Sequence, residues 1–206
     1  MRRRLEGLTR RRVECLTRRR AMIATMAIAT LSMEIAMSTT ADAQTKLDPQ
    51  NTLYMDLKSG RVVIEMFPDI APLMVARVKE LTREGFYNNT PFHRVIEGFM
   101  AQGGDPTGTG TGGSKLPDLP AEFTNKRHFL RGTCGAARTA DPNSANSQFF
   151  IMFAASPHLD GQYTIWGQVV QGMDLVDQIK RGSGSGGTVQ NPDRIVKMQV
   201  MADAKS

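Results

Sequence analysis

Apolar and polar residues alternate in short stretches along most of the chain after residue 51, the pattern of half-buried β-strands. The segment TLYMDLKSGRVVIEMF, residues 52–67, predicts two strands joined around Ser59 and Gly60 as a β-hairpin. Six further strands are predicted from the segments FHRVI, FMAQGGD, FLRGTCGAA, QFFIMF, YTIWGQVV and RIVKMQVM. The folded part of the protein is therefore expected to be mainly β.

Two segments show helical rather than strand-like spacing. The first is DIAPLMVARVKELTREGFY, residues 69–87, in which Asp69 is a candidate N-cap, Pro72 falls in the first turn and Gly85 ends the helix. The second is a short helix around MDLVDQI, residues 173–179. Many strands with two modest helices and no regular strand–helix alternation favour an antiparallel closed barrel with the helices packed at its ends.

The charge of the chain is concentrated in its first 43 residues. The 206 residues carry a net charge of +6, which by itself would suggest nucleic acid or an anionic membrane as a partner. Nine arginines and four acidic residues precede residue 44, which leaves 17 basic (26 − 9) and 16 acidic (20 − 4) residues in the remainder. The remainder is close to neutral, so the charge gives no support for nucleic-acid binding.

The same 43 residues have the three parts of a secretory signal. A cationic stretch ends at Arg20, an apolar stretch covers residues 21–37, and Ala41 and Ala43 form an A-x-A cleavage pattern. A membrane anchor is the alternative, but Glu34 near the end of the apolar stretch weakens a spanning helix. The long basic extension fits either an early start codon or a twin-arginine signal. Cleavage after Ala43 would leave Cys134 as the only thiol, so no intrachain disulfide is expected.

Several kinds of chemistry have no support in the sequence. The glycine cluster at 103–113 is not a phosphate-binding loop, because Ser114 stands where G-x-x-x-x-G-K-[ST] needs lysine, and we expect a flexible surface loop. The histidines His93, His128 and His158 lack the short spacings of a zinc site. The serines lack the G-x-S-x-G context of a hydrolase nucleophile. We therefore expect neither a metal nor a cofactor.

Arg94 stands out in the segment PFHRVIEGFMAQGGD, residues 91–105. Strand alternation would place it on the same side as the apolar residues Phe92 and Ile96. The ordinary explanation is an arginine at a sheet edge, with its head group in a salt bridge. The segment QFFIMF, however, carries large apolar residues on both faces of one strand. One face can fill a barrel, and the other must be covered by a helix or line a groove for a ligand.

Three long segments carry a family resemblance. FHRVIEGFMAQGGD, GAARTADPNSANSQFFI and HLDGQYTIWGQVVQGMDLVDQI resemble the cyclophilins, the cyclosporin-binding class of peptidyl-prolyl cis-trans isomerases, and most of all their exported bacterial members. The likeness covers nearly all of residues 50–202. It implies an eight-stranded antiparallel closed barrel capped by two α-helices, and an activity that interconverts the cis and trans forms of X-Pro bonds during protein folding. After the leader that residues 1–43 predict, it implies an isomerase domain at 44–206, and as an exported type a periplasmic location.

The resemblance also implies a set of site residues. Arg94 matches the catalytic arginine, and Gln102 matches the glutamine that helps to position it. The residues that match substrate-binding positions are Phe99, Met100, Phe150 and Leu159 of the proline pocket, Ala137 and Arg138 along the peptide groove, and Gln148, His158 and Tyr163. Arg138 replaces a common asparagine, His158 a common tryptophan and Tyr163 a common histidine, and the change at His158 predicts weak cyclosporin binding.

The expected partners are proline-containing polypeptides. A monomer is expected, with no nucleic acid bound and no stable membrane insertion once the leader is removed. A proline-peptide binding module without rate enhancement is the second hypothesis. Retention of Arg94, Phe99, Gln102 and Phe150 favours the enzyme.

Overall fold

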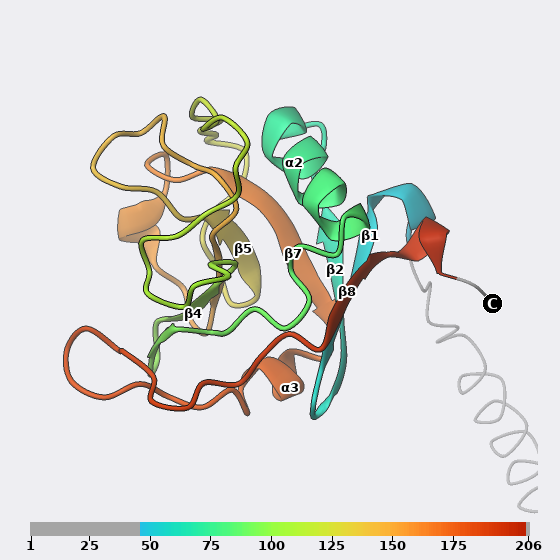
Figure 1. Ribbon diagram of the computed structural model, residues 1–206. Coiled ribbons are helices and arrows are strands. Elements are labelled where there is room, and N and C mark those ends of the chain that lie inside the picture. The colour runs from blue at the N-terminus through green and yellow to red at the C-terminus, as the bar shows by residue number, and fades with distance from the viewer. Residues whose placement is uncertain (1–45, 205–206) are drawn as a thin grey trace, which may run out of the picture. The chain divides into compact units, whose positions relative to one another are not determined.

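The computed structural model describes residues 46–204, and the predicted leader lies outside them. Eight strands form one antiparallel sheet in the order β3-β4-β6-β5-β7-β2-β1-β8 (Figure 1). The strands are β1 (Thr52–Leu57), β2 (Gly60–Met66), β3 (Arg94–Ile96), β4 (Met100–Gly103), β5 (Thr133–Ala136), β6 (Phe149–Met152), β7 (Ile165–Gln171) and β8 (Lys197–Val200). The predicted number of strands and the mainly β class are confirmed.

The sheet curls into a half-barrel, with β3 and β8 at the two ends of the strand order. An isolated bridge between Pro91 and Arg194 joins the segments that precede these two strands. No ladder between β3 and β8 themselves occurs within residues 46–204. Closure of the barrel therefore stays a prediction.

In the described part of the chain, two α-helices accompany the sheet, α2 (Pro72–Arg83) and the single turn α3 (Met173–Val176). Figure 1 shows α2 towards the upper end of the strands and α3 towards the lower end. Three 3-10 turns also occur between residues 46 and 204: η2 (Pro49–Asn51), η3 (Pro157–Leu159) and η4 (Met201–Asp203). None of the helices in the described part of the chain is long and apolar enough to span a bilayer.

The start of α2 differs from the sequence prediction. Asp69 is not the N-cap, because the helix begins at Pro72 and its N-cap, Ala71, has no capping side chain. Glu122, which lies in the long loop between β4 and β5, accepts hydrogen bonds from Leu73 N at 2.8 Å and Met74 N at 2.9 Å. A carboxylate at a helix N-terminus satisfies exposed N–H groups and complements the helix dipole. The cap is therefore supplied by a distant loop.

Strand β6 separates two apolar clusters. The large apolar residues on both of its faces in the sequence predicted this. Phe149 and Ile151 belong to the large cluster inside the half-barrel, which also receives the apolar face of α2. Phe150 and Met152 belong to a smaller cluster on the opposite face. Among the helices of residues 46–204, only η3 contributes a buried residue to the smaller cluster, Leu159. This second face is the one available for a ligand.

The alternation expected around Arg94 holds only from Arg94 onward. Strand β3 begins at Arg94, and Phe92 before it packs into the large cluster together with Val95. Ile96 packs against the smaller cluster, on the same side as Arg94. Placing Phe92 beside Arg94 was wrong, because the chain enters the strand from an irregular segment in which the period of two does not apply.

Candidate active site

Arg94 and Gln102 face each other across the first two strands of the sheet. They are register partners on β3 and β4, and Arg94 Nη1 donates a hydrogen bond of 3.2 Å to Gln102 Oε1. Arg94 Nε donates a second, of 3.0 Å, to the carbonyl oxygen of Gly186. Arg94 makes no ion pair within residues 46–204, so the ordinary explanation of a surface salt bridge does not apply. The guanidinium is held by neutral groups.

A cavity of about 180 Å³ opens next to this pair. It is lined by Arg94, Phe99, Met100, Gln102, Ala137, Arg138, Phe150, Leu159 and Tyr163. Its floor is the smaller apolar cluster, to which Met100, Phe150 and Leu159 contribute buried side chains. All of the site residues expected from the sequence except Gln148 and His158 line this one cavity.

Phe150 is held in the floor by aromatic neighbours. Its ring stacks on Phe129 with centroids 5.6 Å apart and meets the edge of Tyr163 at 5.8 Å. Gly135 lies opposite Phe150 in the β5–β6 register, and the ring occupies the space that a side chain at Gly135 would fill. The position of Phe150 therefore depends on the absence of a Cβ on the neighbouring strand.

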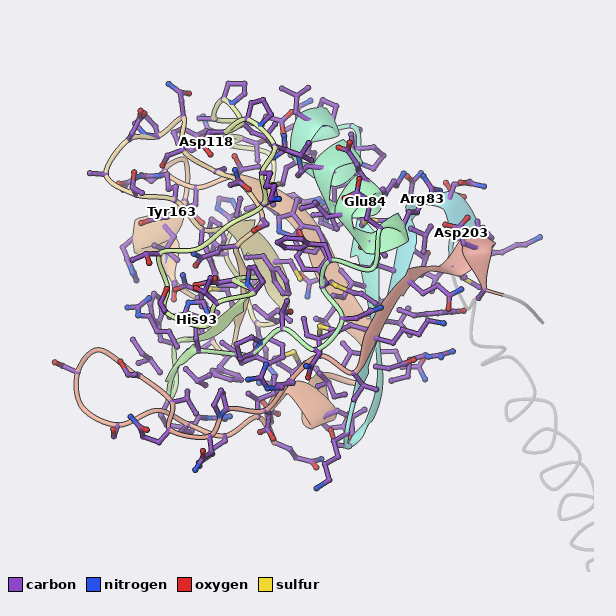
Figure 2. All side chains as sticks on the ribbon, viewed as in Figure 1. Arg83, Glu84, His93, Asp118, Tyr163 and Asp203 are labelled. Carbon is purple, nitrogen blue, oxygen red and sulfur yellow. The ribbon has the colours of Figure 1, made fainter. Side chains whose placement is uncertain are left out.

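Arg138 and Tyr163 form the rim. The Arg138 guanidinium lies 4.4 Å from the centre of the Tyr163 ring, a cation–π contact. Arg138 also donates two hydrogen bonds to the Gln162 carbonyl, from Nε at 3.2 Å and from Nη2 at 3.0 Å. Figure 2 shows Tyr163 on the side of the fold that holds His93 and Asp118, away from the Arg83–Asp203 ion pair at the end of α2.

The two remaining predicted residues lie beside the cavity. His158 stacks on Phe99 with ring centroids 5.8 Å apart and an interplanar angle of 27°. Gln148 lines a second, larger and more polar cavity of about 410 Å³. The two cavities share Gln102, Ala137 and Arg138, so they form neighbouring parts of one continuous surface.

The glycine-rich loop at 105–113 belongs to the site, although its sequence did not predict this. We expected a flexible surface loop, but its first residue, Asp105, is fully buried (0% exposed) and accepts hydrogen bonds from the N–H groups of Thr107, Gly110 and Gly112. The loop lines the polar cavity. An aspartate at the start of a glycine-rich run was the available signal, because short carboxylates bond the backbone of following residues.

Two buried titratable groups, Asp105 of the loop and His93 beside it, belong to this part of the fold. Burial pushes the pKa of Asp105 upward, but the hydrogen bonds from Thr107, Gly112 and Gly110 outweigh it and bring the pKa below its ordinary value. Burial lowers the pKa of His93, and the nearby Asp105 carboxylate offsets this only in part. Asp105 is therefore ionised and His93 neutral at neutral pH.

Comparison with known proteins agrees with this geometry. The sequence model of the family "Cyclophilin type peptidyl-prolyl cis-trans isomerase/CLD" matches residues 52–200. The chain belongs to this cyclophilin family. As a cyclophilin it is a peptidyl-prolyl cis-trans isomerase, so the enzyme hypothesis is confirmed over the binding module.

Two kinds of relative illustrate the match. A probable peptidyl-prolyl cis-trans isomerase from Brucella suis is 52% identical over 194 residues, which cover 88% of this cyclophilin and 97% of the relative. The crystal structure of a cyclophilin from Hirschia baltica superimposes with a TM-score of 0.68 at 28% identity and covers 77% of both chains.

A cyclophilin-type isomerase from Cryptosporidium parvum, solved in the presence of the dipeptide Ala-Pro, also has a TM-score of 0.68. It is 29% identical to this cyclophilin, and the match covers 72% of this chain and 98% of the other. With identities of 28% and 29%, both solved structures support the same family assignment as the sequence matches.

The cavity of this cyclophilin combines two chemistries. Apolar side chains form its floor, and one wall carries a guanidinium with five N–H donors, two of which are used by Gln102 and Gly186. No group of three or more His, Cys, Asp and Glu side chains in the described part of the chain is arranged to hold a metal ion. The arrangement can bind a small apolar ring and direct hydrogen-bond donors at it.

Proposed function

We propose that this cyclophilin binds the proline ring of an X-Pro peptide in the 180 Å³ cavity and that Arg94 is its catalytic residue. The observation that carries the proposal is the position of the Arg94 guanidinium on the wall of a cavity whose floor is apolar. A proline ring has no N–H donor and suits the floor made by Phe99, Met100 and Phe150. The structural relative solved with Ala-Pro supports a proline-containing ligand.

The proposed mechanism lowers the barrier to rotation about the X-Pro amide. That barrier is about 18 to 20 kcal/mol, because the nitrogen lone pair is delocalised into the carbonyl group. In the twisted state the lone pair is localised and can accept a hydrogen bond, which the planar ground states do not offer. A donor from Arg94 to the prolyl nitrogen therefore stabilises the transition state more than either ground state. No covalent bond is broken, so the reaction needs no nucleophile.

Gln102 has two parts in this proposal. Its Oε1 accepts from Arg94 Nη1 and keeps the guanidinium beside the cavity. It also lies on the wall shared by the two cavities, where it can bond the backbone of a peptide that passes from one to the other. Ala137 and Arg138 share that wall, and we assign them to the binding of residues next to the proline.

The test compares Arg94→Ala with Arg131→Ala, a control that removes a partly exposed arginine paired with Asp177 outside the site. NMR exchange on a short Ala-Pro peptide measures turnover, and a titration with the same peptide measures affinity. We expect Arg94→Ala to lower kcat by roughly 10²-fold with little change in affinity, because its bond to nitrogen forms mainly in the twisted state. Equal losses in turnover and affinity would show that Arg94 only anchors the substrate.

We further propose export to the periplasm and removal of residues 1–43. The support is the cationic, apolar and A-x-A organisation of the first 43 residues. The exported protein is then a cofactor-free monomer that begins at or near Gln44 and acts on proline-containing polypeptides. N-terminal mass analysis of the native protein tests the cleavage, and an intact leader in the exported protein would contradict it.

A further inference from the structure

Asp105 organises the glycine-rich loop through both of its carboxylate oxygens. Oδ1 accepts from Thr107 N and Thr107 Oγ1, each at 2.8 Å. Oδ2 accepts from Gly110 N at 2.7 Å and from Gly112 N at 3.1 Å, with a longer contact of 3.5 Å from Thr109 Oγ1. The loop thus wraps around a buried charge whose lone pairs are satisfied by N–H and O–H groups.

The wrapping leaves no room for a side chain at Gly112. A Cβ there would lie 2.1 Å from Asp105 Oδ1 and 2.7 Å from Thr107 Oγ1, well inside van der Waals contact. The close approach of the loop backbone to the carboxylate is therefore built into the loop. It turns the N–H groups of Gly110 and Gly112 towards Asp105.

The carbonyl groups of the same two glycines hold Gln148. Gln148 Nε2 donates to the Gly110 oxygen at 3.0 Å and to the Gly112 oxygen at 2.8 Å. Gln148 Oε1 then accepts from Gln102 Nε2 at 2.9 Å, and Gln102 Oε1 accepts from Arg94 Nη1 at 3.2 Å. A continuous relay of hydrogen bonds runs from Asp105 through the loop and two glutamines to the proposed catalytic arginine.

The chemistry of the groups gives this relay one direction. A backbone carbonyl can only accept, so the loop requires Gln148 to present its NH₂ group to Gly110 and Gly112 and its oxygen to Gln102. Gln102 must in turn present its NH₂ group to Gln148 and its oxygen to Arg94. An amide flip at either glutamine would set a donor against the guanidinium or against another donor. The loop carbonyls therefore determine which atom Arg94 meets.

From this geometry we infer that Asp105 is a positioning residue for Arg94, acting through the loop at 105–113, Gln148 and Gln102. The inference rests on the proposed catalytic role of Arg94. It gives the glycine-rich loop a part in turnover as well as in lining the polar cavity. A loop that only lines the cavity would affect peptide affinity and leave kcat unchanged.

The first test is Asp105→Asn in the full protein. If the asparagine oxygen keeps the Thr107 hydrogen bonds, its NH₂ group faces the N–H groups of Gly110 and Gly112, and two donors oppose each other. The loop then shifts, and its carbonyl groups lose their alignment with Gln148. We expect kcat for an Ala-Pro peptide to fall about tenfold, because misplacement of a catalytic group by a fraction of an ångström is costly. Affinity should change less than about twofold, in keeping with the loss of an interaction made in the transition state.

The matched control is Glu122→Gln. Glu122 is also a loop carboxylate that accepts two backbone N–H groups, but those belong to α2, and no hydrogen bond within residues 46–204 joins it to Gln148. Its kcat should equal that of the wild type. Side-chain amide signals of Gln102 and Gln148 in ¹⁵N NMR spectra should shift in Asp105→Asn and stay in place in Glu122→Gln.

A double-mutant cycle with Arg94→Ala separates this inference from the proposed function. If Asp105 acts through Arg94, Asp105→Asn lowers kcat in the wild type and has no further effect in Arg94→Ala. If Arg94→Ala loses activity but Asp105→Asn keeps full kcat, the role of Asp105 is overturned and the role of Arg94 stands. Full activity in Arg94→Ala would overturn the proposed function itself.

A milder variant covers the case in which Asp105→Asn does not fold. Thr107→Val removes one hydroxyl donor from Oδ1 at an exposed position and keeps the carboxylate. It should lower kcat in the same direction by a smaller factor, about two- to threefold. Unchanged kcat together with unchanged Gln102 and Gln148 signals would count against the relay.

Discussion

The floor of the cavity should respond to a single methyl group placed behind it. Gly135 lies on β5 opposite Phe150, and a Cβ built there would meet Phe150 at 2.4 Å from Cζ and 2.7 Å from Cε2. It would also lie 2.8 Å from Phe129 Cε1. Gly135→Ala is therefore a perturbation of the Phe150 ring that leaves every side chain of the site chemically unchanged.

The size of the response follows from these distances. Ordinary van der Waals contact begins near 3.4 Å, so the tip of the Phe150 ring must move by about 1.0 Å from its 2.4 Å approach. Phe129 stacks on the ring, and the ring lines the cavity of about 180 Å³. The ring should move into the cavity and reduce the space for a proline ring. Overpacking of this kind costs about 1 to 3 kcal/mol of folding free energy.

The assay compares peptide affinity and thermal stability of Gly135→Ala with those of Gly167→Ala. Gly167 lies on β7, where a Cβ would meet the Glu65 carbonyl at 2.8 Å and the Ile64 side chain at 3.1 Å, away from the cavity. Both variants should lose stability, at about 2 to 4 °C in Tm for each kcal/mol. Only Gly135→Ala should weaken Ala-Pro peptide binding, by about tenfold, with kcat reduced less. Equal affinities in the two variants would refute the placement of Phe150 as the floor of the proline site.

Three further predictions concern His158, His93 and Cys134. His158→Trp should tighten cyclosporin binding and change peptide turnover little, because residue 158 stacks on Phe99 beside the cavity and does not line it. An inhibition titration that finds equal cyclosporin affinities in the two proteins contradicts this. In the folded protein, burial lowers the pKa of His93 below its ordinary value of 6.5. The neutral His93 side chain therefore contributes its full stability above pH 6.5, and this stability is lost as the pH falls through the lowered pKa. Urea unfolding at about pH 7 and pH 5 should show a larger loss in the wild type than in His93→Gln. Cys134 is fully buried and burial raises its pKa, so thiol reagents should react slowly with the native protein and Cys134→Ala should keep its isomerase activity.

Local patterns of the sequence predicted the sheet well because each strand carries its own signal. The hairpin of β1 and β2 turns at Lys58 and Ser59 with Leu57 and Gly60 paired, within one residue of the predicted turn. The apolar residues on both faces of β6 predicted a second buried face, which became the floor of the cavity. In these cases the information lies within a window of a few residues, where side-chain periodicity reports directly on burial.

Contacts between distant segments could not be predicted in the same way. Glu122 caps α2 by accepting a hydrogen bond from the Leu73 N–H, 49 residues earlier in the chain. Asp69, close to the start of the helix, was instead the local cap predicted from the sequence. The loop at 105–113 appeared flexible from its glycines, because composition does not show that one buried carboxylate will collect the N–H groups of that loop. The Gly186 carbonyl that accepts from Arg94 is a backbone atom, and no residue letter marks it.

The neutral partners of Arg94 have a consequence for catalysis. A carboxylate beside the guanidinium would form a bidentate ion pair, occupy two of its donors and offset its charge. Gln102 and Gly186 instead take one donor each, which leaves three of the five without a partner within residues 46–204. The charge itself has no ion-pair partner within residues 46–204 and lies beside a cavity with an apolar floor, where a hydrogen bond to a developing lone pair is stronger than in water. Glutamine, which accepts a hydrogen bond without carrying charge, orients the guanidinium and preserves the property on which the proposed mechanism depends.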